Sequence, residues 1–257
     1  MRIAIGLEYD GTAYNGWQRQ RTGTGVQSLV EDAISTVANE KIQVTCAGRT
    51  DTGVHATAQV CHFDTQSARE PHGWMLGANS NLPDDISVTW AHPVDDSFHA
   101  RFSATSRSYH YLILNRVERS ALHRHRAWWV YTDLDAERMH RAAQALHGKH
   151  DFSAFRAARC QASTPVREIS AISVTRDKVW LHVRVTANAF LQHMVRNVMG
   201  TLVAIGCGDK SEEWVAEVLQ SKDRKQAGAA APPHGLTLTG VEYPDAFQLP
   251  RNPNDDL

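Results

Sequence analysis

The stretch AGRTDTGVHA, Ala47–Ala56, places a charged pair, Arg49 and Asp51, between two glycines. It lies between two runs whose patterns predict strands, and its ten residues exceed the about 2 to 5 that usually close a hairpin. Long loops on rigid strands are common places for functional sites. Gly48 and Gly53 permit backbone conformations that other residues avoid, so they can hold the charged pair in a fixed turn. The motif alone favours a plain surface loop, in which Asp51 bonds its own backbone and Arg49 faces water.

Length and composition indicate a folded, globular chain. The 257 residues are 42% hydrophobic and 21% charged, and a chain of this size should bury about 70 to 75% of its unfolded surface. No apolar run reaches the roughly 18 residues of a membrane span, and the four cysteines form no CxxC pair. These features exclude a membrane protein and a secreted disulfide scaffold, and they predict an unexported protein of the cytoplasm.

The net charge of -1 does not indicate a nucleic-acid-binding protein, but the charges are unevenly distributed. The segment Arg101–Arg126 holds six arginines and one acid, Glu118, together with two tyrosines and three histidines. Such a segment can form a local phosphate-binding patch on a nearly neutral protein. From charge alone, a solvated arginine-rich surface is an equally good interpretation.

Hydrophobic periodicity predicts the same order of elements twice: strand, helix, two strands, helix, strand. In the first half, the expected strands cover 2–9, 42–46, 57–64 and 86–91, and the expected helices cover 26–37 and 71–79. In the second half, the expected strands cover 107–114, 168–175, 179–186 and 236–243, and the expected helices cover 135–146, 190–205 and, as an insertion, 211–220. The predicted fold class is α+β, with two ferredoxin-like βαββαβ halves, 1–104 and 105–257, joined around a largely antiparallel central sheet.

Three segments carry more local predictions. The alternation over 2–9 is typical of a strand with one buried face. Residues 227–233 are expected to form a mobile loop, and residues 252–257 a frayed tail.

Several blocks, in the same order along nearly the whole chain, resemble the TruA family of bacterial tRNA pseudouridine synthases. They are EYDGT from Glu8, GWQRQ from Gly16, GRTDTGVH from Gly48, NLP from Asn81, FHARFSA from Phe98, RSYHY from Arg107, NAFL from Asn188, MVRN from Met194 and GLTL from Gly235. One departure is Thr52, where the family more often has alanine. The resemblance implies the pseudouridine synthase fold and a homodimer. It also implies conversion of uridine to pseudouridine at positions 38, 39 and 40 of the tRNA anticodon stem-loop, without cofactor or metal.

The resemblance implies roles for five residues. Asp51 would be the nucleophile, because a carboxylate can hold one fragment covalently and later leave, and Arg196 would be its ion-pair partner. Tyr109 would stack on the target base and relay a proton, and Leu236 would be an apolar contact in the pocket. Arg49 would help to flip the base out of the stem, since a planar guanidinium can stack on bases and bond phosphate. Without the resemblance, Arg196 would be a surface arginine, and Tyr109 and Leu236 would be strand residues of the core.

The resemblance also places RNA contacts in two stretches, through phosphate contacts and recognition of the RNA shape. These contacts are Phe98, His99, Ala100, Arg101, Phe102, Ala158, Arg159, Cys160, Gln161 and Ala162. The fourteen histidines show no metal-ligand spacing, so we expect no metal site. A non-catalytic RNA-binding protein and a metal-dependent nuclease are the competing functions. The sequence leaves open whether Asp51 adds to C6 of uracil or to C1′ of ribose, which tRNAs are modified, the oligomeric state and the role of the tail.

Overall fold

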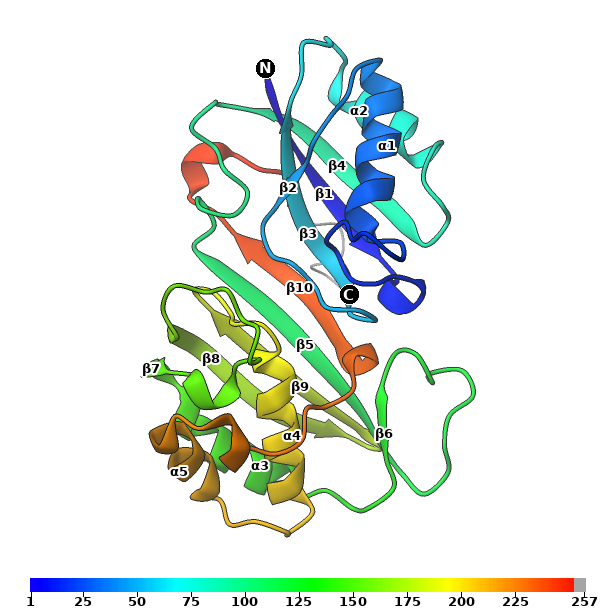
Figure 1. Cartoon of the computed structure of the whole chain (residues 1–257). Coiled ribbons are helices and arrows are strands. Elements are labelled where there is room, and N and C mark those ends of the chain that lie inside the picture. The colour runs from blue at the N-terminus through cyan, green and yellow to red at the C-terminus, as the bar shows by residue number, and fades with distance from the viewer. Residues whose placement is uncertain (252–257) are drawn as a thin grey trace. The chain divides into compact units, whose positions relative to one another are not determined.

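The chain forms two compact units, shown in the computed structural model of Figure 1. The structure describes residues 1–251, and the expected frayed tail over 252–257 lies outside the described residues. One unit comprises Met1–Arg107 and the chain from Leu238 onward, and the other comprises Ser108–Thr237. A single division at residue 104 would assign the last segment to the second unit. That segment belongs to the first unit because Tyr243 Oη donates to Ala100 O at 2.6 Å and Phe247 packs edge-on against Phe98.

The first unit is a sheet with two helices. Its strands lie in the order β4-β1-β3-β10, with β2 paired to β3, and β1 runs antiparallel to both of its neighbours. Helix α2 packs against β4 and against α1. The elements are β1 (Arg2–Tyr9), α1 (Val26–Ala38), β2 (Thr45–Cys46), β3 (His55–Asp64), α2 (Pro71–Asn79), β4 (Ile86–Val94) and β10 (Leu236–Glu242).

Strand β1 is buried on both faces, so the prediction of one buried face is wrong. Ile3, Ile5 and Leu7 are buried, and Ala4 on the opposite face is buried as well. Ala4 belongs to a core cluster with Phe98, to which chain segments distant in sequence contribute. The alternation in the sequence could not reveal that the second face of β1 is covered, because it reports only the size and polarity of the strand residues themselves.

The second unit repeats the combination of sheet and helices. Its strands lie in the order β5-β9-β8-β7, with β7–β8 and β8–β9 antiparallel and β6 paired parallel to β5. The elements are β5 (Ser106–Asn115), β6 (Trp128–Val130), α3 (Ala136–Ala143), β7 (Gly148–Asp151), β8 (Val166–Asp177), β9 (Trp180–Ala187), α4 (Met194–Gly206) and α5 (Trp214–Ser221). The two units together confirm the predicted α+β class with mostly antiparallel strand pairing.

Local differences from the prediction have local causes. Helix α4 begins at Met194 and not at residue 190, because His193 adopts a left-handed conformation with φ 62° that interrupts the helix. The short strands β6 and β7 were not predicted, since three or four residues are too few to show a period. Among residues 1–251, every helix is too short or too polar to pass through a bilayer.

The expected mobile loop over 227–233 instead lies on α4. Gly228 N donates to Thr201 Oγ1 at 3.0 Å, and a side chain at Gly200 would overlap the Ala229 carbonyl oxygen. The loop can therefore approach α4 this closely because Gly200 has no side chain. The small residues of the loop do not reveal this anchor in the sequence, because the acceptor Thr201 and the space above Gly200 belong to helix α4.

We therefore expect Gly200→Ala to lower the free energy of unfolding by about 1 to 3 kcal/mol, since its methyl group collides with backbone. Gly73→Ala is the matched control, because Gly73 also lies in a helix and a Cβ there meets no atom within 4 Å. The control should be neutral or gain up to about 1 kcal/mol. Thermal unfolding followed by circular dichroism measures both, and equal stability of the two variants would contradict the close approach.

Candidate active site

The loop between β2 and β3, residues 47–54, carries Arg49 and Asp51. Its first two residues are fixed by β3: Ala47 N donates to Val60 O at 2.8 Å, and Gln59 Nε2 donates to Gly48 O at 2.6 Å. Gln59 has no exposed surface, so these bonds are shielded from water. Where the loop leaves the sheet, the backbone hydrogen bonds between strands are thus followed by a hydrogen bond from the Gln59 side chain.

Thr50, which precedes Asp51, is the most firmly fixed residue of the loop. Its Oγ1 lies 2.8 Å from Tyr9 Oη, and its carbonyl accepts from Trp17 N at 3.0 Å. Gly16, with φ +84°, lies directly under this peptide: a Cβ there would be 2.6 Å from Thr50 O and 3.0 Å from Asp51 C. The end of β1 and the segment around Gly16 therefore set the position of the Thr50–Asp51 peptide.

The second half of the loop is fixed by residues that follow β1. Val54 N donates to Asp51 O at 3.1 Å, across Gly53 with φ +76°. A side chain at Gly11 would overlap Val54 O, and Gly11 N donates to His55 Nδ1 at 3.1 Å. The structure thus brings together the motifs that begin at Glu8, Gly16 and Gly48. Gly53 needs the conformational freedom expected of it, whereas Gly48 has no positive φ.

This backbone leaves the charged pair on the outside of the turn. Arg49 and Thr52 are exposed, and Asp51 is half-buried, between the buried residues Thr50 and Val54. Burial raises the pKa of the neighbouring Cys46 to about 12, so its thiol is not ionised near neutral pH. Asp51 is therefore the nucleophile candidate that this loop presents.

The second unit holds Tyr109, Arg196 and Leu236. Tyr109 is buried in β5, and its ring meets Phe190 edge-on, with centroids 5.0 Å apart. Arg196 lies in the first turn of α4, where its Nε donates to Ala231 O at 2.8 Å and its carbonyl accepts from Ala231 N at 2.9 Å. Leu236 is buried at the start of β10. The Tyr109 ring and the Arg196 guanidinium are thus each oriented by a neighbouring residue.

Tyr111, the second tyrosine of β5, belongs to the core. It is buried, and its hydroxyl donates to Pro232 O at 2.7 Å. Burial raises the pKa of this hydroxyl well above its usual value. Tyr111 therefore supports the loop that also carries Ala231.

The stretch Phe98–Phe102, called the 98–102 turn below, has two buried and three more accessible side chains. Phe98 and Ala100 have no exposed surface, so they belong to the core. His99 Nδ1 accepts from the backbone N–H groups of Arg101 and Phe102, each at 3.2 Å. Arg101 is exposed, and Phe102 is 75% exposed with its ring 5.4 Å from the Arg101 guanidinium carbon. The turn therefore presents a cation and an aromatic ring to solvent.

The other predicted RNA-contacting stretch, 158–162, is a surface segment of the second unit. Ala158, Arg159 and Gln161 are exposed, while Cys160 and Ala162 are half-buried. The turn is closed by Cys160 N, which donates to the carbonyl of Ala157 at 3.0 Å. Arg159 and Gln161 are the long polar side chains that this segment presents.

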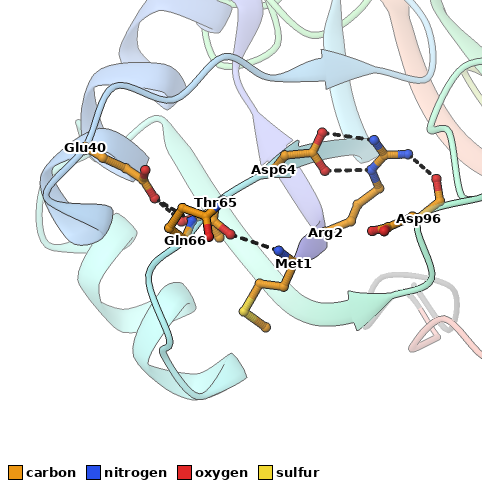
Figure 2. A pocket seen from close by; sticks show the side chains of 7 residues that line it. All are labelled: Met1, Arg2, Glu40, Asp64, Thr65, Gln66 and Asp96. Atoms are coloured by element: carbon orange, nitrogen blue, oxygen red, sulfur yellow. Dashed lines mark hydrogen bonds and ion pairs between the residues drawn. The ribbon is translucent and has the colours of Figure 1, made fainter.

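Figure 2 shows a surface cavity of about 380 Å³ lined by Met1, Arg2, Glu40, Asp64, Thr65, Gln66 and Asp96. Three of its charged side chains are bonded within its own wall: Arg2 makes two bonds of 2.9 Å to Asp64, and Glu40 accepts from Gln66 N at 2.8 Å. The Arg2 guanidinium holds the pKa of the Asp64 carboxyl below its usual value. None of the predicted site residues lines this cavity, so it is a poor candidate for the active site.

Residues 1–251 contain no group of three or more His, Cys, Asp or Glu side chains arranged to hold a metal ion. The residues that sequence reasoning missed are those that fix the loop: Gln59, Tyr9 and Trp17. Tyr9 and Trp17 lie inside motifs that were identified, and Gln59 is a polar residue in an otherwise apolar stretch of β3. A buried polar residue must find hydrogen-bond partners, which was the available signal.

Comparison with known proteins gives consistent results. A family profile described as tRNA pseudouridine synthase matches residues 6–103 and 142–244. Proteins named tRNA pseudouridine synthase A from Shewanella baltica and Shewanella amazonensis are each 54% identical over 251 residues, which cover 98% of this chain and 96% of theirs. Among solved structures, a Cbf5-Nop10-Gar1 complex matches with a TM-score of 0.40 and 12% identity over 92% of this chain and 48% of that chain.

The anchoring of the loop predicts a specific effect of Gly16→Ala. Gly208→Ala is the matched control, because Gly208 has the same φ of +84° but a Cβ there meets no atom within 4 Å. Both variants should lose about 1 to 2 kcal/mol from backbone strain. Only Gly16→Ala should also speed hydrogen–deuterium exchange over 47–55, since its methyl group displaces the Thr50–Asp51 peptide. Unchanged exchange in Gly16→Ala would show that Gly16 does not fix the loop.

Proposed function

Because the chain belongs to the tRNA pseudouridine synthase family of isomerases, we propose that it converts uridine to pseudouridine at positions 38, 39 and 40 of the tRNA anticodon stem-loop, with Asp51 as the nucleophile. The observation that carries this proposal is the position of Asp51 in its loop. The flanking residues Thr50 and Val54 are buried and hydrogen-bonded, while Asp51 remains half-buried. A rigid backbone with an accessible carboxylate is what covalent catalysis by a side chain requires.

We propose that the reaction proceeds without a cofactor or a metal, and its balance requires no redox group. The bond from C1′ of ribose to N1 of uracil breaks, a bond from C1′ to C5 forms, C5 loses a proton and N1 gains one. No electrons are gained or lost overall, so no redox group is required. Asp51 holds one fragment covalently between the two bond changes, by adding either to C6 of uracil or to C1′ of ribose, and then leaves.

Three residues of the second unit, together with Arg49 of the first, act on the base and on the charge of Asp51. We assign Tyr109 to stacking on the uracil and to moving the C5 proton, and its edge-on contact with Phe190 supports a fixed ring orientation. Arg196 pairs with Asp51, so that its guanidinium balances the charge of the carboxylate. Leu236 supplies an apolar contact to the base. Arg49, exposed beside Asp51, stacks where the flipped base has left the helix.

The accessible side chains of the 98–102 turn and of 158–162 contact the RNA. His99, Arg101, Phe102, Arg159 and Gln161 bond phosphates or stack on exposed bases. The buried Phe98 and Ala100 do not touch the RNA and instead support the turn. The smaller residues Ala158, Cys160 and Ala162 contribute to the shape of the surface that contacts the RNA. We further propose that the enzyme acts as a homodimer, in the cytoplasm where tRNA is used.

Asp51→Asn tests the nucleophile, because it keeps the shape of the side chain and removes its ability to form a covalent bond. We expect pseudouridine formation under single-turnover conditions to disappear, with tRNA affinity within about tenfold of the wild type, about 1.4 kcal/mol. The assay is run in EDTA after the tRNA has been folded, so that it also tests metal-free catalysis.

Thr52→Ala is the control for Asp51→Asn, since Thr52 is the exposed neighbour of Asp51 and alanine is the more common residue of the family there. It should retain wild-type activity. If Asp51→Asn retains a tenth of the wild-type rate in protein free of deamidation, Asp51 is not the nucleophile.

Arg101→Ala and Arg159→Ala test the RNA-contacting stretches. Each should weaken tRNA binding and flatten the dependence of the logarithm of affinity on the logarithm of salt concentration, by about one unit of slope, because fewer counterions are released. Arg69→Ala, at an exposed arginine before α2, should leave affinity and slope unchanged. Equal slopes in all three variants would place Arg101 and Arg159 outside the RNA interface.

A further inference from the structure

Arg107, the second residue of β5, is a buried arginine that bonds three backbone carbonyls. It is 7% exposed, and its Nη1 donates to Ala104 O at 3.0 Å. Its Nη2 donates to Ala47 O at 3.1 Å and to Arg101 O at 2.5 Å. A planar guanidinium offers several donors in a fixed fork, so one side chain can hold three acceptors at once.

The three carbonyls belong to two different functional segments. Ala47 is the first residue of the loop that carries Asp51, and Arg101 and Ala104 lie in and just after the 98–102 turn. The two segments are about fifty residues apart in the sequence, and the same nitrogen of Arg107 bonds both. A shift of the turn therefore moves the Arg107 head group, and with it the start of the loop.

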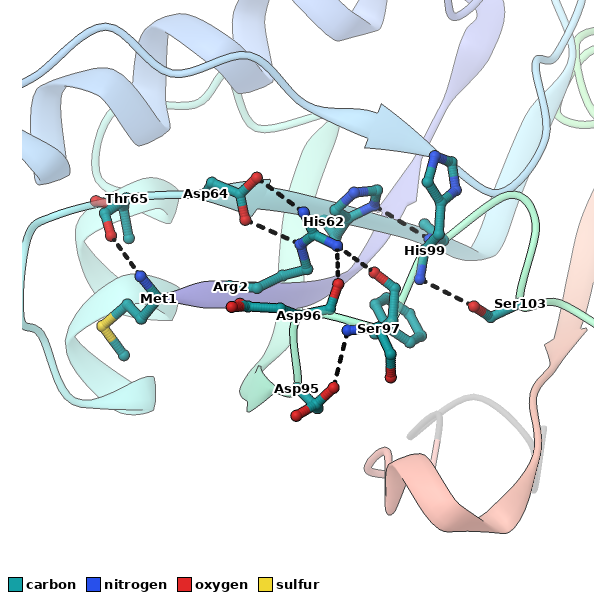
Figure 3. Close-up of polar contacts among 12 residues, drawn as sticks. Met1, Arg2, His62, Asp64, Thr65, Asp95, Asp96, Ser97, His99 and Ser103 are labelled. Atoms are coloured by element: carbon teal, nitrogen blue, oxygen red, sulfur yellow. Dashed lines mark hydrogen bonds and ion pairs between the residues drawn. The ribbon is translucent and has the colours of Figure 1, made fainter.

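The rest of the turn is fixed separately from the loop. Figure 3 shows Arg2, whose Nη1 donates to Asp96 O at 2.5 Å and to Phe98 O at 2.8 Å while its other nitrogens bond Asp64. His62 Nδ1 accepts from Ala100 N at 3.1 Å, and burial lowers the pKa of this imidazole to about 4, so it is a neutral acceptor near pH 7. Arg2 and His62 thus hold the turn in place, and Arg107 adds the connection to the loop.

We propose that Arg107 is a positioning residue that couples the RNA-contacting 98–102 turn to the loop of Asp51. When phosphates bind Arg101, the Arg107 fork keeps Ala47 at a fixed distance from the turn, so that the bound RNA and the loop of Asp51 stay aligned. This inference rests on the proposed function, because it takes Asp51 as the nucleophile and Arg101 as an RNA contact.

Two matched variants separate coupling from binding. Arg2→Lys and Arg107→Lys each keep the positive charge and lose the planar fork, but Arg2 bonds Asp64 and the turn side without bonding Ala47. We expect Arg2→Lys to weaken tRNA binding with the single-turnover rate at saturating tRNA within twofold of the wild type. Arg107→Lys should lower that saturating rate at least tenfold. If Arg107→Lys changes affinity alone, or if both variants lose the same rate, Arg107 does not couple the two segments.

A second measurement does not depend on the folding of a variant with a changed buried residue. Arg101→Ala and Arg69→Ala both remove an exposed cation, but only Arg101 lies in the turn that Arg107 joins to the loop. Coupling requires Arg101→Ala to lower the saturating single-turnover rate as well as the affinity, with Arg69→Ala changing neither. Equal saturating rates in these two variants would overturn the coupling. Activity of Asp51→Asn would instead overturn the proposed function, so the two failures are distinguishable.

Discussion

The arrangement of the candidate site depends on one backbone contact, the approach of Gly16 and Trp17 to the Thr50 peptide. Trp17 N donates to Thr50 O at 3.0 Å, and a Cβ at Gly16 would lie 2.6 Å from the same oxygen. A residue with a side chain would push this carbonyl away, and Asp51 follows it directly. The spacing between Gly16 and the loop is thus set by hard-sphere repulsion on one side and a hydrogen bond on the other.

Buried polar side chains hold two segments of the first unit, the loop that carries Asp51 and the 98–102 turn. Gln59 bonds the start of the loop, His62 bonds the middle of the 98–102 turn, and Arg107 bonds both. In a low-dielectric interior these bonds are strong, and leaving one partner unsatisfied is costly, so each segment has few alternative positions. The apolar cluster around Phe98 places the turn roughly, and the buried polar groups fix its position.

The sequence predicted the long elements better than the contacts between them. Periodicity located β1, β3, α1, α2 and β8, because their core faces repeat over many residues. It missed β6 and β7, which are too short to repeat, and the burial of Ala4, which depends on chain segments far away in the sequence. The motifs identified Asp51 and its charged neighbour, but not Gln59 or the linking role of Arg107. Gln59 and Arg107 bond backbone carbonyls of other segments. Every residue has such a carbonyl, so the amino-acid sequence does not show which one a side chain will bond.

The division of work between backbone and side chain follows from what a nucleophile must do. In the role proposed for it, Asp51 has to reach a base, form a bond and release it, so its carboxylate must stay accessible to the substrate. Its position must nevertheless be defined, because freedom of the reacting group adds an entropy cost to every turnover. The loop meets both requirements by fixing the peptides at Thr50 and Val54 and leaving the Asp51 side chain half-buried. The ordering cost is then met once, when the chain folds, and the loop spans eight residues, 47–54, because the anchors on each side occupy most of it.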